Sequence, residues 1–290
     1  MPGDAMKLAA DLIQRLIRTL AIVLLVVVGS TMLVRFAPGY LSDAREMDSR
    51  YGDAARAELS AEAARSNSLW QMLSTEMRGW TQGDLGVSRQ YEVPVLELIE
   101  PRMAVTGNLL LRSIVFGWTL SLCAALLSSA GRNPSLIWQA PAALLLAVPT
   151  AAMATICLLA DSGGPVLVMT LLLAARDFKF LDRILRKVWR DQHLLQARAQ
   201  GITTPRLIWA YILPSIRPQL LALATLSIVT ALSAIVPVEV IFSVPGLGQL
   251  AWNAAMNRDL PVLLAVTMLM AIAVTCAGMT SNRPVEWQAE

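Results

Sequence analysis

Long apolar runs without charged residues are the feature that most constrains the fold of this chain. A helix needs about 20 predominantly apolar residues to cross the hydrocarbon of a bilayer, and only helices or closed barrels satisfy their backbone polar groups there. With 56% hydrophobic and 16% charged residues, the chain also departs from the composition of soluble domains. Six such runs occur, at 19–34, 113–131, 133–160, 162–175, 218–238 and 260–282. The sequence therefore predicts an all-α, polytopic membrane protein with six transmembrane helices in a lipid bilayer.

Three of the runs differ from a simple straight span. The first is interpreted as an uncleaved span, because no small-x-small cleavage pattern follows it. The third contains Pro141 and Pro149, which favour a kink. The fourth offers only 14 residues before Arg176, or about 21 Å of a hydrocarbon core roughly 30 Å thick. We therefore expect its helix to continue past Arg176, with that side chain reaching the interface or facing the helix bundle.

The distribution of charge predicts the orientation. Residues 40–102 carry eleven acids and seven arginines, whereas the stretch from Arg176 to Arg217 carries nine basic residues and three aspartates. Lys and Arg are enriched in cytoplasmic loops, so we expect residues 181–214 inside, residues 40–102 outside and both termini in the cytoplasm. The expected parts are 1–35, an N-terminal cytoplasmic segment and first span; 36–104, an extracytoplasmic segment with helical character; 105–284, the transmembrane core including the cytoplasmic loop 181–214; and 285–290, a cytoplasmic tail.

Residues 181–214 form the only long polar interval in the second two-thirds of the chain, LDRILRKVWRDQHLLQARAQGITTPRLIWAYILP. Gly201 follows a helical stretch and suits the first position after a helix, where a left-handed residue is favoured. Thr203 and Thr204 can cap a following helix, and Pro205 suits its first helical position. The pattern predicts a helix, a glycine elbow and a second, short helix.

This stretch resembles the cytoplasmic coupling loop of ABC-importer permeases, often called the EAA loop. The similarity consists of a glycine after an alanine-rich turn and a Leu-Pro pair in the next helix, in the wording typical of dipeptide, oligopeptide and nickel permeases. The family's usual Asp-Tyr is replaced by Gln192 and His193. For His193, contact with a partner protein and a solvated helix position both stay open. The resemblance implies that the ATPase-coupling residues are Ala197, Arg198, Ala199, Gly201, Leu213, Pro214 and His193.

Two further motifs carry the same resemblance. The stretch EVIFSVPGLG resembles the signature after the fifth span of peptide permeases, which implies an outer gate made by Glu239, Phe242, Pro245, Gly246, Leu247 and Gly248. Its glycines permit a tight turn, and its glutamate, at the edge of an apolar run, needs a polar partner or water. A carboxylate at the interface without a role in transport is the alternative for the glutamate. Before the second span, an outer-segment motif is formed by Gly83, Asp84, Leu85 and Gly86, where a plain turn is the alternative.

Several classes of chemistry have no counterpart in the sequence. There is no Walker-type phosphate loop, no G-x-S-x-G and no H-E-x-x-H. His193 is the only histidine, and the three cysteines lie in apolar runs without metal-ligand spacing. The net charge of +3 is small and unevenly distributed. We therefore expect no catalytic residues, no metal, no cofactor of its own and no nucleic-acid partner.

The resemblance implies a permease subunit of an ABC importer in the bacterial inner membrane, moving di- or oligopeptides, or nickel or another small solute. It also implies a heterodimer with a second homologous permease, two cytoplasmic ATPases that bind ATP and Mg²⁺, and an extracytoplasmic solute-binding protein. An ion-coupled secondary carrier is disfavoured, because such carriers place ionisable residues within their spans and these spans are nearly free of them. A membrane scaffold without transport activity is the other alternative, suggested by a connection between the third and fourth spans that is shorter than in the family.

Overall fold

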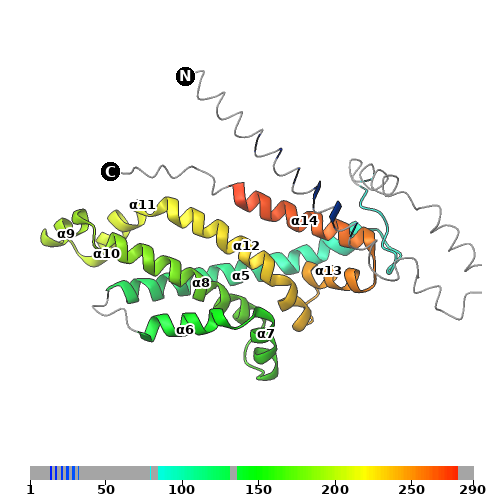
Figure 1. The fold of residues 1–290 in the computed structure, drawn as a ribbon, viewed down its shortest axis with the longest axis horizontal. Coiled ribbons are helices and arrows are strands. Elements are labelled where there is room, and N and C mark those ends of the chain that lie inside the picture. Colours follow the sequence, from blue (N-terminus) through cyan, green and yellow to red (C-terminus); the bar gives the residue numbers. More distant parts are fainter. Residues whose placement is uncertain are drawn as a thin grey trace, which may run out of the picture. The chain divides into compact units, whose positions relative to one another are not determined.

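The computed structural model describes residues 84–130 and 136–279, together with isolated positions between residues 14 and 79. Within these residues all the regular structure is helical, apart from a single bridge between Val87 and Pro94, so the expected all-α class is confirmed (Figure 1). The run at 19–34, most of the outer segment and the tail lie outside the two continuous ranges. The helices are α5 (Val95–Ala130), α6 (Leu136–Ala147), α7 (Thr150–Leu159), α8 (Pro165–Val188), α9 (Gln192–Ala199), α10 (Thr204–Leu207), the π-helix η1 (Ile208–Ile212), α11 (Leu213–Ser215), α12 (Arg217–Ile241), α13 (Leu247–Met256) and α14 (Leu260–Met279).

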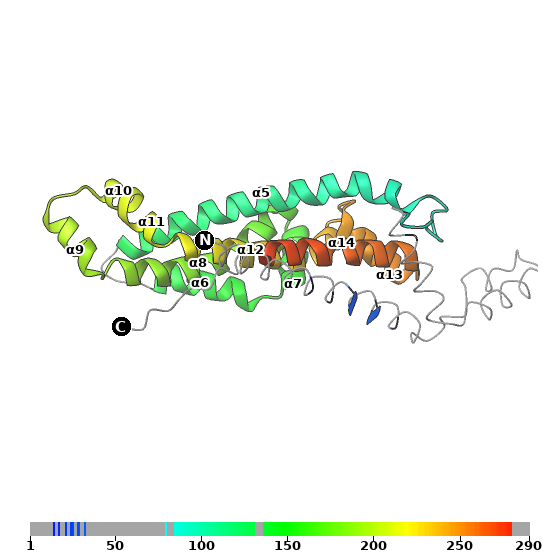
Figure 2. The ribbon, with the colours of Figure 1, turned by 90° about the horizontal axis from the view of Figure 1, so that it is seen from above.

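The described residues divide into two compact units. One contains residues 84–102 and 250–272, and the other contains residues 103–249 and 273–279. In the second unit, α8 packs against α6, α7 and α12, and the short helices α10, η1 and α11 lead from α9 into α12 (Figure 2). The whole of the predicted coupling loop, residues 181–214, therefore belongs to the same unit as the long helices that it connects.

Three helices in the described ranges are long and apolar enough to cross a membrane, namely α5, α12 and α14. The pair α6 and α7 meets the same criteria together, but it is bent by 98°. Pro149 stands directly before α7, and a residue that precedes proline avoids the helical conformation. The kink expected in the third run is therefore confirmed at Pro149, while Pro141 lies inside α6. The bent pair is either a broken span or a re-entrant loop.

Helix α8 continues past Arg176, as the length of its apolar run predicts. It begins at Pro165, after Gly164 at its N-cap, and ends at Val188. The guanidinium of Arg176 donates from Nη1 to the carbonyl oxygen of Leu226 in α12, at 3.1 Å. The cation at this position is thus held against the bundle.

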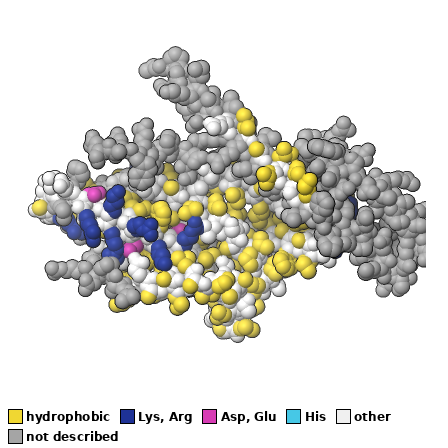
Figure 3. Space-filling model, viewed as in Figure 1, with side chains coloured by type: hydrophobic (Ala, Val, Ile, Leu, Met, Phe, Trp, Pro, Cys, Tyr) yellow, Lys and Arg dark blue, Asp and Glu magenta, His cyan; other side chains and the backbone are white. Residues whose placement is uncertain are grey.

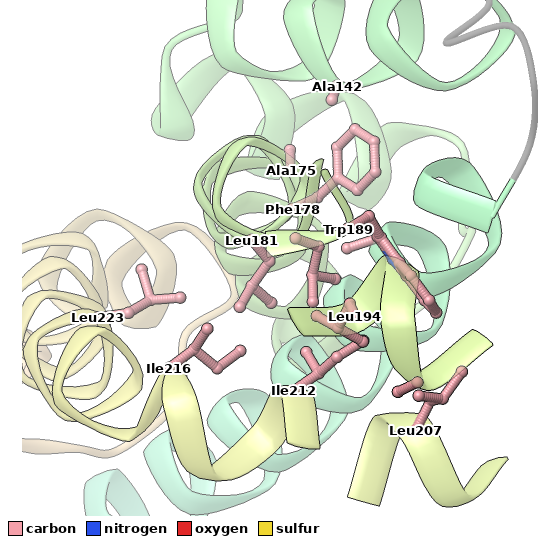
Figure 4. Packing of buried hydrophobic residues seen from close by; sticks show 13 residues of the cluster. Ala142, Ala175, Phe178, Leu181, Trp189, Leu194, Leu207, Ile212, Ile216 and Leu223 are labelled. Atoms are coloured by element: carbon pink, nitrogen blue, oxygen red, sulfur yellow. The ribbon is translucent and has the colours of Figure 1, made fainter. Parts of the chain in front are cut away.

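The main hydrophobic core of the second unit lies where the coupling loop meets the long helices. Figure 4 shows large apolar side chains from α8, the loop helices and α12 packed together. Burying each of them stabilises the fold by about 1.5–3 kcal/mol, so the loop is held in one place by the core of the bundle. The larger members are Phe178, Leu181, Leu185, Trp189, Leu194, Leu207, Ile212, Ile216 and Leu223.

Gly117 marks a close approach of α5 and α8, and it supplies a test of this packing. A Cβ atom there would lie 3.0 Å from Cβ of Leu173 and 3.5 Å from the carbonyl oxygen of Thr170. We expect Gly117→Leu to push the helices apart and to destabilise the protein by about 1–3 kcal/mol. The measurement is the thermal unfolding midpoint in detergent. Gly107→Leu on the same helix is the matched control, because nothing lies within 4 Å of its Cβ position. An equal shift for both variants would contradict the assigned contact.

Candidate functional site

The elbow predicted at Gly201 is present. Helix α9 ends at Ala199, and Gly201 has a φ of +78°, in the left-handed region that favours glycine. The N–H of Gly201 donates to the carbonyl oxygen of Arg198 at 3.0 Å, and the N–H of Ile202 donates to that of Ala197 at 3.3 Å. These two bonds are the pair that defines a Schellman helix end. The interpretation of Gly201 as the residue that ends the helix is confirmed.

The second loop helix differs in detail from the expectation. It begins at Thr204, and the carbonyl oxygen of Thr203 accepts the N–H of Leu207 at 3.0 Å. Pro205 is therefore the second helical residue, one position later than predicted. The helix then widens into the π-helical turn η1, which ends at Ile212, two residues before Pro214. Proline has no N–H to donate to the carbonyl four residues earlier, and a π turn is a known departure from α-helical bonding. The proline was the only signal in the sequence for this turn.

The predicted coupling residues do not all share one surface. Ala199 and Gly201 are exposed at the elbow, whereas Ala197 is only 5% exposed and belongs to the hydrophobic core. Ala197 therefore packs in the core behind the elbow and is not part of the exposed surface of the elbow. Leu213 is half-buried and Pro214 is exposed. His193 lies in the first turn of α9, and its side chain is outside the described part of the structure.

Polar contacts tie this loop to α5. The guanidinium of Arg198 lies over the ring of Trp189, 4.2 Å from its centroid, which is a cation–π geometry. The indole Nε1 of Trp189 donates to Ser129 Oγ in α5 at 3.0 Å. One turn earlier, Arg186 Nη2 donates to Ser128 Oγ at 2.7 Å. Contacts between α9 and α5 therefore pass through the end of α8.

The same network reaches α6 through a buried carboxylate. Asp182 is 2% exposed, and its Oδ2 accepts from Arg186 Nε at 2.8 Å and from Gln139 Nε2 at 2.7 Å. Nearer the N-terminus of α8, Asp177 is fully buried and its Oδ2 accepts from Ser227 Oγ of α12 at 2.8 Å. The helices are thus less free of ionisable groups than the sequence analysis expected. Arg186 and Asp182 are four residues apart on one helix, but the contacts to Gln139 and Ser227 join residues 43 and 50 positions apart, which no local pattern could reveal.

Glu239 in the fifth-span signature has a defined structural partner. Its side chain is fully buried in α12. Oε1 accepts from Thr106 Oγ1 at 2.7 Å, and Oε2 accepts from the N–H groups of Gly248 at 2.7 Å and Gln249 at 3.2 Å. The N–H of Leu247 donates in turn to Thr106 Oγ1 at 2.8 Å. The carboxylate and the hydroxyl therefore satisfy the first free N–H groups of α13, where negative charge is favoured.

We call this contact of Glu239 with Thr106 and the first turn of α13 the Glu239 junction. The glycines of the signature are required by its close packing. A Cβ atom on Gly246 would overlap the carboxylate of Glu239, and one on Gly248 would lie 2.8 Å from Cα of Val236. The turn is a close backbone approach, as the sequence pattern predicts. Of the other signature residues, Phe242 is half-buried at the end of α12, Pro245 is exposed and Leu247 is buried. The structure thus brings Glu239, Gly246, Leu247 and Gly248 together around Thr106, which the sequence analysis did not assign to the site.

The outer-segment motif makes a turn that a second carboxylate holds. Asp84 Oδ1 accepts the N–H of Gly86 at 2.8 Å, and Gly86 has a φ of +79°. Asp259 is 1% exposed and accepts hydrogen bonds from Ser88 Oγ and from the N–H groups of Arg89 and Gln90. Leu85 is half-buried, and Gly83 lies outside the described residues. The partnership between Ser88 and Asp259, 171 residues apart, was not predicted.

Neither the Glu239 junction nor the turn held by Asp259 resembles a catalytic or metal centre. In residues 84–130 and 136–279, no group of three or more His, Cys, Asp and Glu side chains is placed to hold a metal ion. The carboxylates of Glu239 and Asp259 are occupied by backbone N–H groups and hydroxyls. The arrangement is suited to joining helices and turns.

Comparison with known proteins decides the class. Residues 107–287 match the family described as "Binding-protein-dependent transport system inner membrane component". The chain belongs to this family. It is 22% identical over 322 aligned residues to the dipeptide transport system permease protein DppB of Escherichia coli, with 92% of this chain and 95% of the relative covered. It is 24% identical to the oligopeptide transport system permease protein OppB of Haemophilus influenzae, covering 89% and 90%, and 25% identical to the glutathione transport system permease protein GsiC of Pectobacterium atrosepticum, covering 89% of each chain.

Family membership confirms the resemblance drawn from the coupling loop. The chain is a membrane component of an ABC transporter, and it is not an enzyme, because ATP is hydrolysed on separate subunits of such transporters. Members of the family bind no cofactor of their own and work with ATPase and solute-binding partners. The matched region contains the elbow, the loop helices and Glu239 with its glycines, while Thr106 lies one residue before it.

The Glu239 junction can be tested through Gly246. We expect Gly246→Ala to displace the carboxylate and leave N–H groups of α13 without an acceptor, which costs about 1–3 kcal/mol per buried group. The thermal midpoint in detergent should fall, and solute uptake should fall with it. Gly164→Ala is the matched control, because its φ is −94° and nothing lies within 4 Å of its Cβ position. An unchanged midpoint for Gly246→Ala would show that the junction has another geometry.

Proposed function

We propose that this chain is one of two permease subunits of an ABC importer that carries di- or oligopeptides across the bacterial inner membrane. The observation that carries the proposal is similarity over nearly the whole chain to permeases named for dipeptide, oligopeptide and glutathione transport. The loop and the signature after the fifth span are both present, so the parts needed for coupling and for the outer junction are retained. Alternating access driven by the ATPases is the mechanism that this assembly supports.

The proposed assembly is a heterodimer with a second homologous permease, two cytoplasmic ATPases that bind ATP and Mg²⁺, and an extracytoplasmic solute-binding protein. In this chain the proposed six spans are the run at 19–34, α5, the bent pair α6 and α7, α8, α12 and α14. Both termini then lie in the cytoplasm. The basic character of residues 176–217 supports this orientation.

Coupling is proposed to begin at the elbow. Ala199 and Gly201 are exposed there, and small side chains allow the groove of an ATPase to approach the backbone closely. Behind the elbow, Ala197 packs in the hydrophobic core and Arg198 packs on Trp189. A push on α9 is thereby transmitted to α8 and α5 through packed groups that cannot move independently.

Whereas coupling begins at the elbow, the Glu239 junction is proposed to act at the outer mouth of the pathway. It joins α12, which follows the coupling loop, to Thr106 of α5 and to the N-terminal N–H groups of α13. Movement of α12 therefore has to carry the start of α13 with it or break buried hydrogen bonds. This supports a role for the signature in shaping the outer mouth of the pathway.

The elbow provides the test of coupling. Gly201→Val places a β-branched residue at a φ of +78°, which strains the backbone by roughly 1–2 kcal/mol, and adds bulk at the proposed contact. We expect normal membrane insertion, with ATP-dependent uptake reduced tenfold or more, on the order of 1.4 kcal/mol of lost coupling. The measurements are peptide uptake and copurification of the ATPases. Gly164→Val, at a negative φ and in open space, should behave like the wild type. Wild-type uptake by Gly201→Val would remove the coupling role.

The proposed orientation has a separate test. Val87 is 56% exposed in the outer turn, and Arg190 is exposed just after α8. In a chain whose native cysteines have been replaced, Val87→Cys should react with a membrane-impermeant thiol reagent in intact cells. Arg190→Cys should react only after the cells are opened. The reverse pattern would overturn the orientation.

A further inference from the structure

Four carboxyl groups are buried in residues 84–130 and 136–279, and Asp177 differs from the other three in its partners. Glu239 and Asp259 each accept from two backbone N–H groups as well as from a hydroxyl. Asp182 forms an ion pair with an arginine and accepts from a side-chain amide. Asp177 has neither kind of partner: its Oδ2 lies 2.8 Å from Ser227 Oγ of α12, and its Oδ1 has no hydrogen-bond partner among the described residues. The mechanism proposed so far does not use this carboxyl.

The neighbouring cation does not resolve the position of Asp177. Arg176 interacts electrostatically with Asp177, but among the described residues the two do not form an ion pair. The Nη1 of Arg176 instead donates to the carbonyl oxygen of Leu226, at 3.1 Å. An ionised carboxylate that is buried without hydrogen-bond donors is so costly that the group takes up a proton instead. The burial of Asp177 therefore favours its neutral form.

The other charged groups of the packed helices lie farther from this carboxyl. On α12 they are Arg217 and Glu239, each about three turns from Ser227. On α5 the last is Arg112, which is exposed, while α6 contains no titratable side chain and α7 only Cys157. The basic side chains of α8 lie on another face of that helix, and Figure 3 shows Lys and Arg gathered at the surface over α8 and toward α9. None of these described groups forms an ion pair with Asp177.

The hydrogen bonds around Ser227 point to the same form of Asp177. The indole Nε1 of Trp118 in α5 lies 3.2 Å from Ser227 Oγ and can only donate. The carbonyl oxygen of Leu223, one turn earlier in α12, lies 2.9 Å from the same Oγ and can only accept. A serine hydroxyl has one hydrogen, so it cannot serve both Leu223 and Asp177. A protonated Asp177 supplies the second hydrogen, and all three contacts of Ser227 are then made at once.

We propose that Asp177 is a proton-binding site inside the helical bundle. Its carboxyl O–H donates to Ser227 Oγ, the hydroxyl of Ser227 donates to the carbonyl oxygen of Leu223, and the indole of Trp118 donates to the remaining lone pair of Ser227. The bound proton thus joins α8 to α12 and, through Ser227, to α5. The ligand of this site is the proton itself, and the site does not depend on which solute is transported.

The bound proton makes the packing of these helices depend on pH. In a conformation that admits water to Asp177, the proton passes to water and leaves a hydrated carboxylate. Returning to the packed arrangement then requires the carboxylate to take up a proton again. Because the packed state binds one proton more than the opened state, raising the pH favours the opened state.

Infrared spectroscopy tests the protonation of Asp177 directly. The full-length chain, with the subunits that copurify with it, is measured in nanodiscs at neutral pH, and the spectrum of Asp177→Asn is subtracted from that of the wild type. We expect the C=O stretching band of a protonated carboxyl, shifted by exchange into D₂O. In Ser227→Ala the carboxyl loses its acceptor, so the band should move to higher wavenumber. Carboxylate bands alone in the difference spectrum would overturn the proposal.

The Ser227→Ala spectrum also decides the question if Asp177→Asn does not assemble. Subtracting it from the wild type should then show a protonated carboxyl band at two positions, one for each protein. An unchanged carboxyl region would contradict the proton site. Neither measurement requires the transported solute, so a failure of the proposed peptide transport would leave this result readable.

Thermal unfolding supplies the second arm. The amide of Asp177→Asn can donate to Ser227 without binding a proton. Its midpoint should equal that of the wild type near about pH 6 and exceed it near about pH 9, because one bound proton changes the unfolding equilibrium by up to about tenfold per pH unit. Asp182→Asn is the matched control on the same helix, and it should lower the midpoint at each pH because Arg186 loses its ionic partner. Parallel pH profiles for the wild type and Asp177→Asn would overturn the proposal, as would equal destabilisation by the two asparagine variants.

Discussion

Helix α8 has to satisfy two different surroundings at once, and much of the second unit depends on how it does so. One face buries Phe178, Leu181 and Leu185 in the main hydrophobic core, and the other carries the basic side chains of Arg176, Lys179, Arg183 and Lys187. The contrast explains why α8 does not meet the apolar criterion that α5, α12 and α14 meet. Because its buried face extends into the coupling loop through Trp189, Leu194 and Ala197, the core that holds α8 also holds the elbow. The same helix therefore holds the loop by hydrophobic packing and carries positive charge along its other face.

Buried carboxylates join the segments that packing alone would leave independent. Glu239 accepts hydrogen bonds from Thr106 and from the first turn of α13, and Asp259 accepts them from Ser88 and the turn that follows it. A carboxylate accepts several hydrogen bonds at once, and in a site without water each lost bond is costly. Such junctions favour one geometry of the backbone and oppose small displacements. They suit a protein whose helices move as connected pieces.

Contacts between the coupling loop and the bundle follow the same principle. Arg198, Trp189 and Ser129 form a chain of contacts from α9 to α5, and Asp182 links Arg186 to Gln139 of α6. These contacts oppose a displacement of α9 relative to α8 and α5. The loop therefore behaves as part of the helical bundle.

Local features of this chain were readable from its sequence, and long-range ones were not. Gly201 ends α9 as predicted, because a left-handed position after a helix selects glycine over almost every other residue. The kink at Pro149 and the continuation of α8 past Arg176 also follow from local rules on proline and helix length. The burial of Ala197, the hydroxyl of Thr106 and the pairing of Ser88 with Asp259 depend on residues 100 or more positions apart or on side chains from several helices. Hydrophobic periodicity and turn chemistry act over a few residues, and so the sequence by itself determined the helical class, the elbow and the family. Which carboxylate meets which N–H group is decided by how helices pack, and only the tertiary structure could show it.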